Sequence, residues 1–423
     1  MRPFPPLPEY IELEHQVAQI LQTQEEHGWY FDQASAWEFA QTLEGELHKI
    51  DELLRNRFPF IAGPLFTPKK SNRTRGYVAG CPFTKVKELN TTSRDHIAWI
   101  LQTHCGWKPN KLTPTGKPII DETSLKEIGS EVAMRFLSQL EMTKSVAFLS
   151  NGVNAWLKLC TSASRIHHHC SVSTNTHRCA HRKPNLAQVP SESDFRRLFT
   201  ATPGQCMVGA DLSGIELRML SHYLARYDSG RYADILLNGD IHQVNADKIG
   251  ITRKQVKTVT YAFLYGAGDE KIGYSIDPLL TAKKAKSTGK DVRAAYVDAI
   301  LGLSELIDAV KKAGEKGSIK GIDGRKFTID SPHKALNYLL QGSAGVIAKR
   351  WMVINQQKIK ELNLCANQLA FIHDELQYEC SPEHAEDLCS SLVLSAAEAG
   401  EYYRLRCPIA AEAVRGGTWA DTH

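Results

Sequence analysis

Two aspartates, each following a short apolar segment, are the residues of this chain best suited to hold metal ions. Asp211 follows the segment 205–210, and Asp374 lies just after the segment 369–372. Such short apolar runs are typical of buried strands, so we expect both side chains at strand ends, facing a cleft. Two carboxylates from separate strands can bind a pair of Mg²⁺ ions and stabilise both oxygens of an in-line phosphoryl displacement. Either segment alone could equally be a solvated acidic turn.

A third segment carries a basic and aromatic stripe at helical spacing. Arg253, Lys257, Tyr261 and Tyr265 recur every fourth residue and would lie within an arc of about 120° on one helix face. Two cations followed by two phenol rings suit a triphosphate at one end and a stacked base at the other. The alternative is an amphipathic helix with a solvated basic edge. The Gly-rich sequence after Tyr265 argues against it, because glycine lets other groups approach the backbone closely.

Length and composition fit a globular protein with more than one core. The chain has 423 residues, of which 42% are hydrophobic and 23% charged, and its net charge is only +4. A nearly neutral surface still permits a basic cleft. The ten cysteines include no CxxC pair, which argues against a zinc ribbon and favours reduced thiols. Without a targeting segment or an apolar run of about 18 residues, we expect no membrane association and a cytoplasmic protein, in the host cell if viral.

The three segments resemble motifs A, B and C of the family A DNA polymerases, the DNA polymerase I-like group. The resemblance is strongest to the replicative polymerases of short-tailed bacteriophages, and it covers nearly the whole chain. Other segments match the family in the same order, which makes the likeness specific. They are Arg178 with Pro184–Pro190, Asn238–His242, Phe263–Gly273, and Ser331–Asn337 running into Leu339–Gln341.

The resemblance implies an α+β fold, the right-hand polymerase fold, with an antiparallel sheet in the palm and helical fingers and thumb. We expect a palm-entry segment at 1–30, a thumb at 31–160 with a flexible basic loop near 58–89, palm at 161–223 with the template-primer segment and motif A, fingers at 224–336 with motif B, and palm at 337–423 with motif C and the C-terminus.

The resemblance also implies catalytic roles. Asp211 and Asp374 would hold two Mg²⁺ ions, with the backbone carbonyl of Leu212 as a further metal ligand. Lys257 would protonate the departing pyrophosphate. Glu375 belongs to motif C and would join the catalytic group, although a direct metal role is not assigned to it.

Substrate contacts follow from the same resemblance. Glu216 would block the 2′-hydroxyl and so favour deoxynucleotides, whereas single-subunit RNA polymerases, which share this palm, need space there. The implied dNTP-binding residues are Arg253, Lys257, Tyr261, His242, Glu216 and Tyr265, and the implied DNA-binding residues are Arg178, Gln341 and His373.

The resemblance thus predicts a DNA-templated DNA polymerase that adds dNTPs to a primer 3′ end by two-metal phosphoryl transfer, with phage genome replication as its role. Met1 leads almost directly into the segment that follows the exonuclease domain in relatives, so we expect no 3′–5′ exonuclease. A separate exonuclease subunit is a candidate partner, whereas a processivity factor is doubtful. A catalytically inactive polymerase-like DNA-binding subunit and a single-subunit RNA polymerase stay open as alternatives.

A His- and Cys-rich segment at 167–181 has no role in this scheme. Its spacing is irregular, so a DNA-contacting hairpin with exposed histidines around Arg178 is favoured over a metal site. His177 stands where the family usually has Gly, so the turn before Arg178 can differ from that of relatives.

Overall fold

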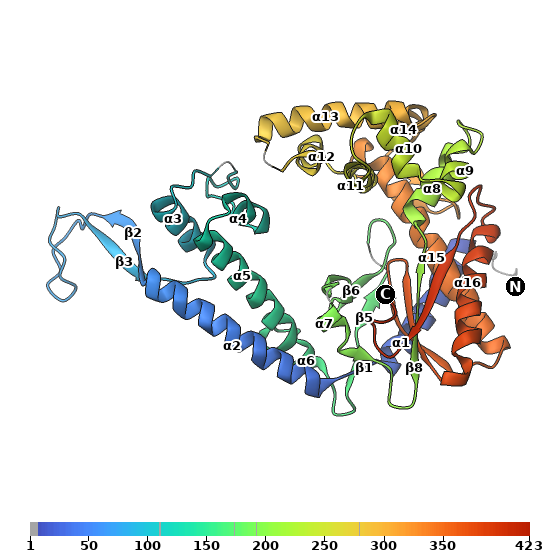
Figure 1. Cartoon of the computed structure of the whole chain (residues 1–423), viewed down its shortest axis with the longest axis horizontal. Coiled ribbons are helices and arrows are strands. Elements are labelled where there is room, and N and C mark those ends of the chain that lie inside the picture. Colours follow the sequence, from blue (N-terminus) through green and yellow to red (C-terminus); the bar gives the residue numbers. More distant parts are fainter. Residues whose placement is uncertain (1–6, 110, 173, 192, 279) are drawn as a thin grey trace, which may run out of the picture. The chain divides into compact units, whose positions relative to one another are not determined.

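The chain folds into two compact units. The structure is a computed structural model that describes residues 7–109, 111–172, 174–191, 193–278 and 280–423. The first unit comprises Met1–Gln33 with Lys158–His423, and the second comprises Ala34–Leu157 (Figure 1). Helices and an antiparallel sheet occur together in the first unit, which confirms the predicted α+β class.

A four-stranded antiparallel sheet with the order β11-β12-β8-β13 is the centre of the first unit. The two inner strands are buried almost throughout, because helices α16 and α1 pack on the sheet and α15 packs against both helices. These elements are β8 (Cys206–Leu212), β11 (Ala366–Ile372), β12 (Glu375–Cys380), β13 (Ala411–Gly416), α1 (Glu9–His27), α15 (Ala335–Glu361) and α16 (Ala385–Tyr402).

The two expected strand ends are present in this sheet. Strand β8 ends at Leu212, and Gly214, in the left-handed conformation with φ 57°, redirects the chain into helix α8 (Ile215–Leu224). Strands β11 and β12 are joined by the two residues His373 and Asp374. Both aspartates of the sequence pattern therefore stand where inner strands of one sheet end.

The chain between strands β8 and β11 is mainly helical. The predicted helical stripe begins at α11, whose first turn is closed by a capping box between Thr252 and Gln255. Gly273 and Gly289 let α12 and α13 pack closely, since a Cβ at Gly289 would lie 1.7 Å from the Asp269 carbonyl oxygen. The helices are α9 (Arg231–Asn238), α10 (Ile241–Ile249), α11 (Arg253–Leu264), α12 (Asp269–Ile276), α13 (Ala282–Ala299) and α14 (Leu303–Gly314).

Smaller elements complete the first unit. The aromatic side chains of Trp29, Phe199 and Trp419 pack together beside a three-stranded sheet with the order β4-β1-β7. The remaining strands and helices are β1 (Trp29–Phe31), β4 (Arg165–Ile166), β5 (His169–Ser171), β6 (Ala180–Arg182), α7 (Ser193–Arg196), β7 (Phe199–Thr200), β9 (Ser318–Lys320), β10 (Lys326–Thr328) and three 3-10 turns (Leu186–Gln188, Pro332–Lys334 and Pro382–His384).

The second unit is mainly helical and has its own core, which includes Leu54, Ile97, Leu125 and Phe136. It falls within the segment 31–160, whose assignment as a thumb stays a prediction. Its elements are α2 (Gln33–Arg57), β2 (Phe60–Phe66), β3 (Phe83–Glu88), α3 (Arg94–His104), α4 (Glu122–Ile128), α5 (Glu131–Val146), a π-helical turn (Ala147–Asn151) and α6 (Trp156–Leu159).

The expectation of a flexible loop near 58–89 is wrong for its two ends, because β2 and β3 pair as an antiparallel hairpin. The register shifts between Ala62 and Leu65, and this irregularity accommodates Pro64, which cannot donate to a regular ladder. Gly63 is required there, since a Cβ would lie 2.7 Å from the Lys85 carbonyl oxygen. Gly63 and Pro64 interrupt the alternation of apolar and polar residues in β2, so the sequence pattern did not indicate a strand.

No helix among the described residues has the length and apolar character needed to cross a bilayer.

Candidate active site

The sheet brings the two aspartates of the sequence pattern together. In the register of β8 and β12, Asp211 lies opposite Glu375, the residue that follows Asp374. The backbone N–H of Leu212 donates to the carbonyl oxygen of Asp374 at 3.0 Å. The turn that carries Asp374 is thus bonded directly to the end of the strand that carries Asp211.

Negative charge accumulates at this junction. Asp211 is exposed to solvent, but partial desolvation of its carboxylate by the surrounding protein, together with the charges of Asp374 and Glu375, raises its pKa to about 7. Burial and the charge of Glu216 raise the pKa of Asp374 to about 6, against the opposing effect of Arg178. Carboxylates that repel each other in this way fit divalent cations, which prefer oxygen ligands and stabilise the ionised form.

Glu375 has a different environment from the two aspartates. Its Oε1 accepts hydrogen bonds from the indole N–H of Trp419 at 2.6 Å and from Gln377 Nε2 at 2.8 Å, and its Oε2 lies 3.1 Å from His423 Nδ1. Burial raises the pKa of Glu375, but these bonds, led by that from His423, hold it below its ordinary value. Because protein donors already occupy both oxygens, Glu375 fits a supporting role better than that of a metal ligand.

Glu216 lies at the centre of a buried polar network. Its Oε1 accepts from Arg178 Nη2 at 3.0 Å and from the hydroxyl of Tyr265 at 2.8 Å. The Glu216 side chain is only 9% exposed and that of Arg178 13%, so this ion pair is shielded from water. Burial and the charge of Glu216 raise the pKa of Tyr265 to about 12. The structure thus joins residues from three separate segments of the sequence.

The residues expected to contact the primer lie beside this network. Arg178 packs against α15, where a Cβ at Gly345 would lie 3.4 Å from Arg178 Cγ. Gln341 is one helical turn before Gly345, on the same face of α15. His373 adopts a left-handed φ of 60°, uncommon for a residue with a side chain, and its Nδ1 is buried without a hydrogen-bond partner.

The basic end of α11 lies near His242 and Asp240. Arg253 Nε donates to Asp240 Oδ2 at 2.7 Å, and the other oxygen of Asp240 caps α10. His242 is mostly buried, and its pKa is lowered by burial and by the charges of Arg253 and Lys257. The ring of Tyr261 lies 6.3 Å from that of His242.

The stripe on α11 therefore runs from a basic end to the acidic junction. Burial raises the pKa of Tyr261, and the charges of Glu216, Asp374 and Asp211 raise it further, which places the phenol near those carboxylates. Lys257, one turn earlier, is exposed on the same helix face. This order suits a ligand with phosphates at one end and a sugar and base at the other.

Sequence reasoning missed the groups that hold the predicted residues in place. Asp240 is the ion-pair partner of Arg253, and Trp419 and His423 bind Glu375. Asp240 lies inside a segment that resembles the family, but nothing in its spacing indicated Arg253. The partners of Glu375 lie 44 and 48 residues further along the chain, beyond the reach of any local pattern.

The His- and Cys-rich segment forms the expected hairpin, since β5 pairs with β6. The expectation of exposed histidines is wrong for His168 and His181, which are buried. The reason is the alternation of the hairpin strands, which turns Cys170 and His181 toward the interior, with His168, just before β5, on the same side as Cys170. His177 adopts a φ of 56°, which a glycine would take without strain.

Comparisons with known proteins agree with this geometry. A sequence model described as "DNA polymerase family A" matches residues 80–421. Proteins named "DNA-directed DNA polymerase" from Enterobacteria phage T3 and Escherichia phage T7 are each 31% identical, over 98% of this chain and 70% of the relative. The "DNA polymerase I" of Aquifex aeolicus is 24% identical over 73% of this chain and 54% of the relative.

A solved structure has the same fold. It is described as the POL domain of Pol1 from M. smegmatis in complex with DNA primer-template and dNTP. The superposition has a TM-score of 0.78 at 22% identity and covers 96% of this chain and 70% of that one, so the polymerase fold is shared. By sequence and by fold, the chain belongs to DNA polymerase family A and is a DNA-directed DNA polymerase.

Proposed function

We propose that this polymerase extends a primer 3′ end with dNTPs through two Mg²⁺ ions held by Asp211 and Asp374, with the Leu212 carbonyl as a further ligand. One observation carries the proposal. The two carboxylates meet at the ends of inner strands of one sheet, and their pKa values are raised to about 7 and about 6, with burial as the first cause. Bound Mg²⁺ would supply Lewis-acid stabilisation of the charge on the transferring phosphoryl group.

The side chains of α11 would bind the incoming nucleotide. Arg253 offers its guanidinium to phosphate oxygens in exchange for its exposed contact with Asp240, and Lys257 carries a proton that it can give to the leaving pyrophosphate. His242 would contact a phosphate. The Tyr261 phenol lies near enough to the carboxylates for their charges to raise its pKa, and a sugar would lie between them.

The Glu216 network would select the sugar and position the primer-template. Glu216 is fixed by Arg178 and Tyr265, so its carboxylate cannot move aside to admit a 2′-hydroxyl. Tyr265 is 48% exposed, which leaves its ring available for stacking at the template end of the new base pair. His373, Gln341 and Arg178 would contact the DNA near the primer 3′ end.

Primer extension tests the proposal. On a defined template, each dNTP supplied alone should be added only opposite its complementary base and only with Mg²⁺. Asp374→Asn should abolish addition while the protein still binds primer-template. If the wild-type chain binds the DNA tightly but adds no nucleotide, it is instead an inactive DNA-binding subunit. Preferential use of ribonucleotides would favour the RNA polymerase alternative.

The expected role in phage genome replication is part of this proposal and is supported by the likeness to phage polymerases. Disrupting the gene in its native genome should stop synthesis of that genome, whereas normal synthesis would count against the role. A separate assay on 3′-labelled primer without nucleotides tests the expectation that the 423-residue chain lacks 3′–5′ exonuclease activity.

A further inference from the structure

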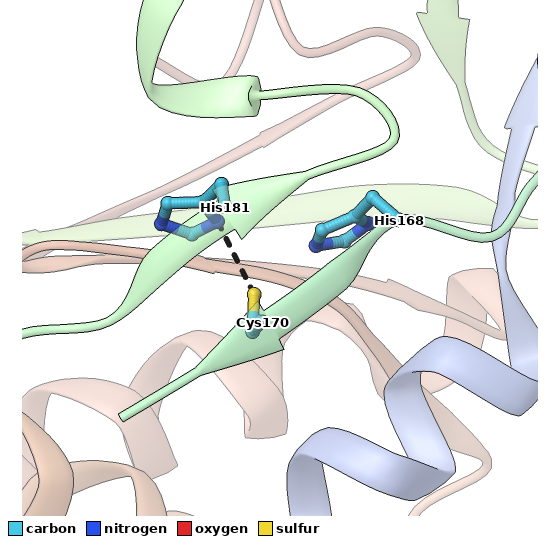
Figure 2. A group of neighbouring side chains, drawn as sticks. All are labelled: His168, Cys170 and His181. Carbon is cyan, nitrogen blue, oxygen red and sulfur yellow. Dashed lines mark hydrogen bonds between the residues drawn. The ribbon is translucent and has the colours of Figure 1, made fainter. Parts of the chain in front are cut away.

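Three side chains that the polymerase reaction does not use converge on one face of the β5–β6 hairpin. His168 directly precedes β5 and Cys170 lies two residues further on, within the strand, and both side chains are on the same side of the hairpin. In the register of the hairpin, His181 lies directly opposite Cys170. Figure 2 shows that the two imidazole rings and the thiol lie next to one another at the two strands. Their potential ligand atoms all lie within 4.8 Å of one another.

Each of the two histidine rings has one nitrogen with a polar neighbour and one nitrogen without a hydrogen-bond partner among the described residues. Cys170 Sγ lies 3.2 Å from His181 Nδ1, and Gln24 Nε2 lies 3.1 Å from His168 Nε2. The other nitrogen of each ring, His168 Nδ1 and His181 Nε2, is buried and has no hydrogen-bond partner among the described residues. His168 is completely buried and His181 is 8% exposed. Buried polar atoms without a partner are uncommon in native proteins, so a complete hydrogen-bond network does not explain why these two histidines are buried.

We propose that His168, Cys170 and His181 form a zinc-binding site. Imidazole nitrogen and thiolate sulfur are the ligands that Zn²⁺ prefers. Two such ligands on one tetrahedral ion are about 3.5 Å apart, so the observed separations require only small side-chain rotations. On binding, the Cys170 thiol would lose its proton to solvent, and its sulfur and one nitrogen of each ring would each donate an electron pair to the metal.

The charge states of the three residues suit this assignment. Burial lowers the pKa of His168 to about 3 and that of His181 to about 4, so both imidazoles are neutral near pH 7 and retain a free electron pair. Burial raises the pKa of the Cys170 thiol, so without a metal it stays protonated and the cluster carries no charge. A divalent cation would bring the compensating charge that makes the thiolate stable in this position.

The carboxamide of Gln24 on α1 offers a fourth ligand. Its Nε2 faces both His168 Nε2 and Cys170 Sγ, the latter at 3.7 Å, and its Oε1 accepts from Gln368 Nε2. Rotation of the Gln24 amide by half a turn would present its oxygen to the metal. Gln368 can rotate in the same way, because the Tyr378 hydroxyl beside its Oε1 can donate or accept. This rotation gives up only the weak hydrogen bond from Gln368 Nε2 to Met352 Sδ.

A metal at this position would join β5, β6 and α1 beneath the primer-binding region. The ring of His181 lies 6.1 Å from that of His373, the residue before the catalytic Asp374. The loop between β5 and β6 carries Arg178, which pairs with Glu216. A zinc ion would therefore fix the base of the loop that holds Arg178 in place, and we assign it a structural rather than a chemical role.

Metal content and Co²⁺ spectroscopy test the site. The chain should be produced without a polyhistidine tag, purified without chelators and analysed for metals by mass spectrometry. We expect about one equivalent of Zn²⁺ per chain. After exchange with Co²⁺, the protein should show a thiolate-to-cobalt charge-transfer band and the intense visible bands of a tetrahedral site. Ions at the acidic junction cannot produce the charge-transfer band, because no cysteine contributes to that junction.

Variants then assign the band to the cluster. Cys170→Ser and His181→Gln should each lose the zinc and the charge-transfer band, and Gln24→Leu should weaken metal binding. Cys179→Ala is the matched control, because Cys179 is a buried cysteine of the same segment that does not belong to the cluster, and it should retain both. Wild-type protein that shows neither zinc nor the Co²⁺ band, whatever the folding of the variants, would overturn the proposal. So would a Cys170→Ser protein that keeps both.

Discussion

Replacing Glu216 tests both the stability and the selectivity attributed to its network. Glu216 Oε1 accepts two hydrogen bonds, and one comes from the guanidinium of Arg178, whose side chain is only 13% exposed. Glu216→Ala would leave Arg178 without this counter-ion and Tyr265 without this acceptor. A buried hydrogen bond to a charged group contributes about 1.5–3 kcal/mol, so we expect unfolding to become easier by about 2–3 kcal/mol.

The same substitution should change sugar selection. Removing the side chain opens space at the position that the 2′-hydroxyl would occupy. Discrimination by steric exclusion of a small group is typically about 10–200-fold, so the ratio of kcat/KM for a ribonucleotide to that for the matching deoxynucleotide should rise by a factor in this range. Glu216→Gln is the matched control. It keeps the volume but removes the charge, so it should lose stability while retaining most of the selectivity.

Two assays separate these effects. Urea denaturation followed by fluorescence gives the change in unfolding free energy, and single-nucleotide addition under steady-state conditions gives the selectivity. A double-mutant cycle with Arg178→Met should report a coupling of about 1–3 kcal/mol between the two side chains. If Glu216→Ala leaves the ratio of ribonucleotide to deoxynucleotide kcat/KM unchanged, Glu216 does not exclude the 2′-hydroxyl. A coupling near zero would refute the buried ion pair.

Three further changes probe the two ends of the site and the sheet. Lys257→Ala should lower kcat/KM for dNTP addition by about 10²-fold, measured by primer extension; a rate equal to wild type would exclude Lys257 from the reaction. Asp240→Asn keeps the cap of α10 but removes the charge that pairs with Arg253. The freed arginine should bind the triphosphate more readily, so we expect a lower KM for dNTP, by at most about fivefold because the ion pair is exposed. A higher KM would show instead that Asp240 holds Arg253 in its productive position. Burial raises the pKa of Glu379, but hydrogen bonds led by that from His27 lower it overall to about 2, below its ordinary 4.5. Its carboxylate therefore stabilises the fold by about 3 kcal/mol at neutral pH, and this is lost as the pH falls from about 4.5 to about 2. Glu379→Gln should flatten the dependence of unfolding free energy on pH in that window, and an unaltered slope would contradict the assignment.

Local sequence patterns identified the candidate site residues but not the residues that hold them in position. The strand before Asp211, the turn at Asp374 and the helix at Arg253 each follow from a short stretch of sequence, because hydrophobic periodicity and capping act over a few residues. The pairing of Asp240 with Arg253 and of Trp419 with Glu375 depends on tertiary packing, which no local pattern encodes.

The hairpin at β5 and β6 shows a second limit. The spacing from His168 to His181 looks irregular along the chain, and only the antiparallel register places Cys170 opposite His181. A turn of unknown length conceals which residues face each other, so a metal site built across a hairpin is hard to recognise without the register. At β2, Gly63 and Pro64 concealed a strand because they belong to its irregular part.

Single-turnover addition by Asp211→Asn and Asp374→Asn most directly tests the claim that these two side chains share the catalytic metal ions. Each variant, assembled on primer-template and mixed rapidly with dNTP and Mg²⁺, should add nucleotide at least about 10³-fold more slowly than wild type, and the double variant should be no slower than either single one. Asp387→Asn, an exposed substitution on α16, should leave the rate unchanged. A wild-type rate in either active-site variant, with DNA binding intact, would contradict the account.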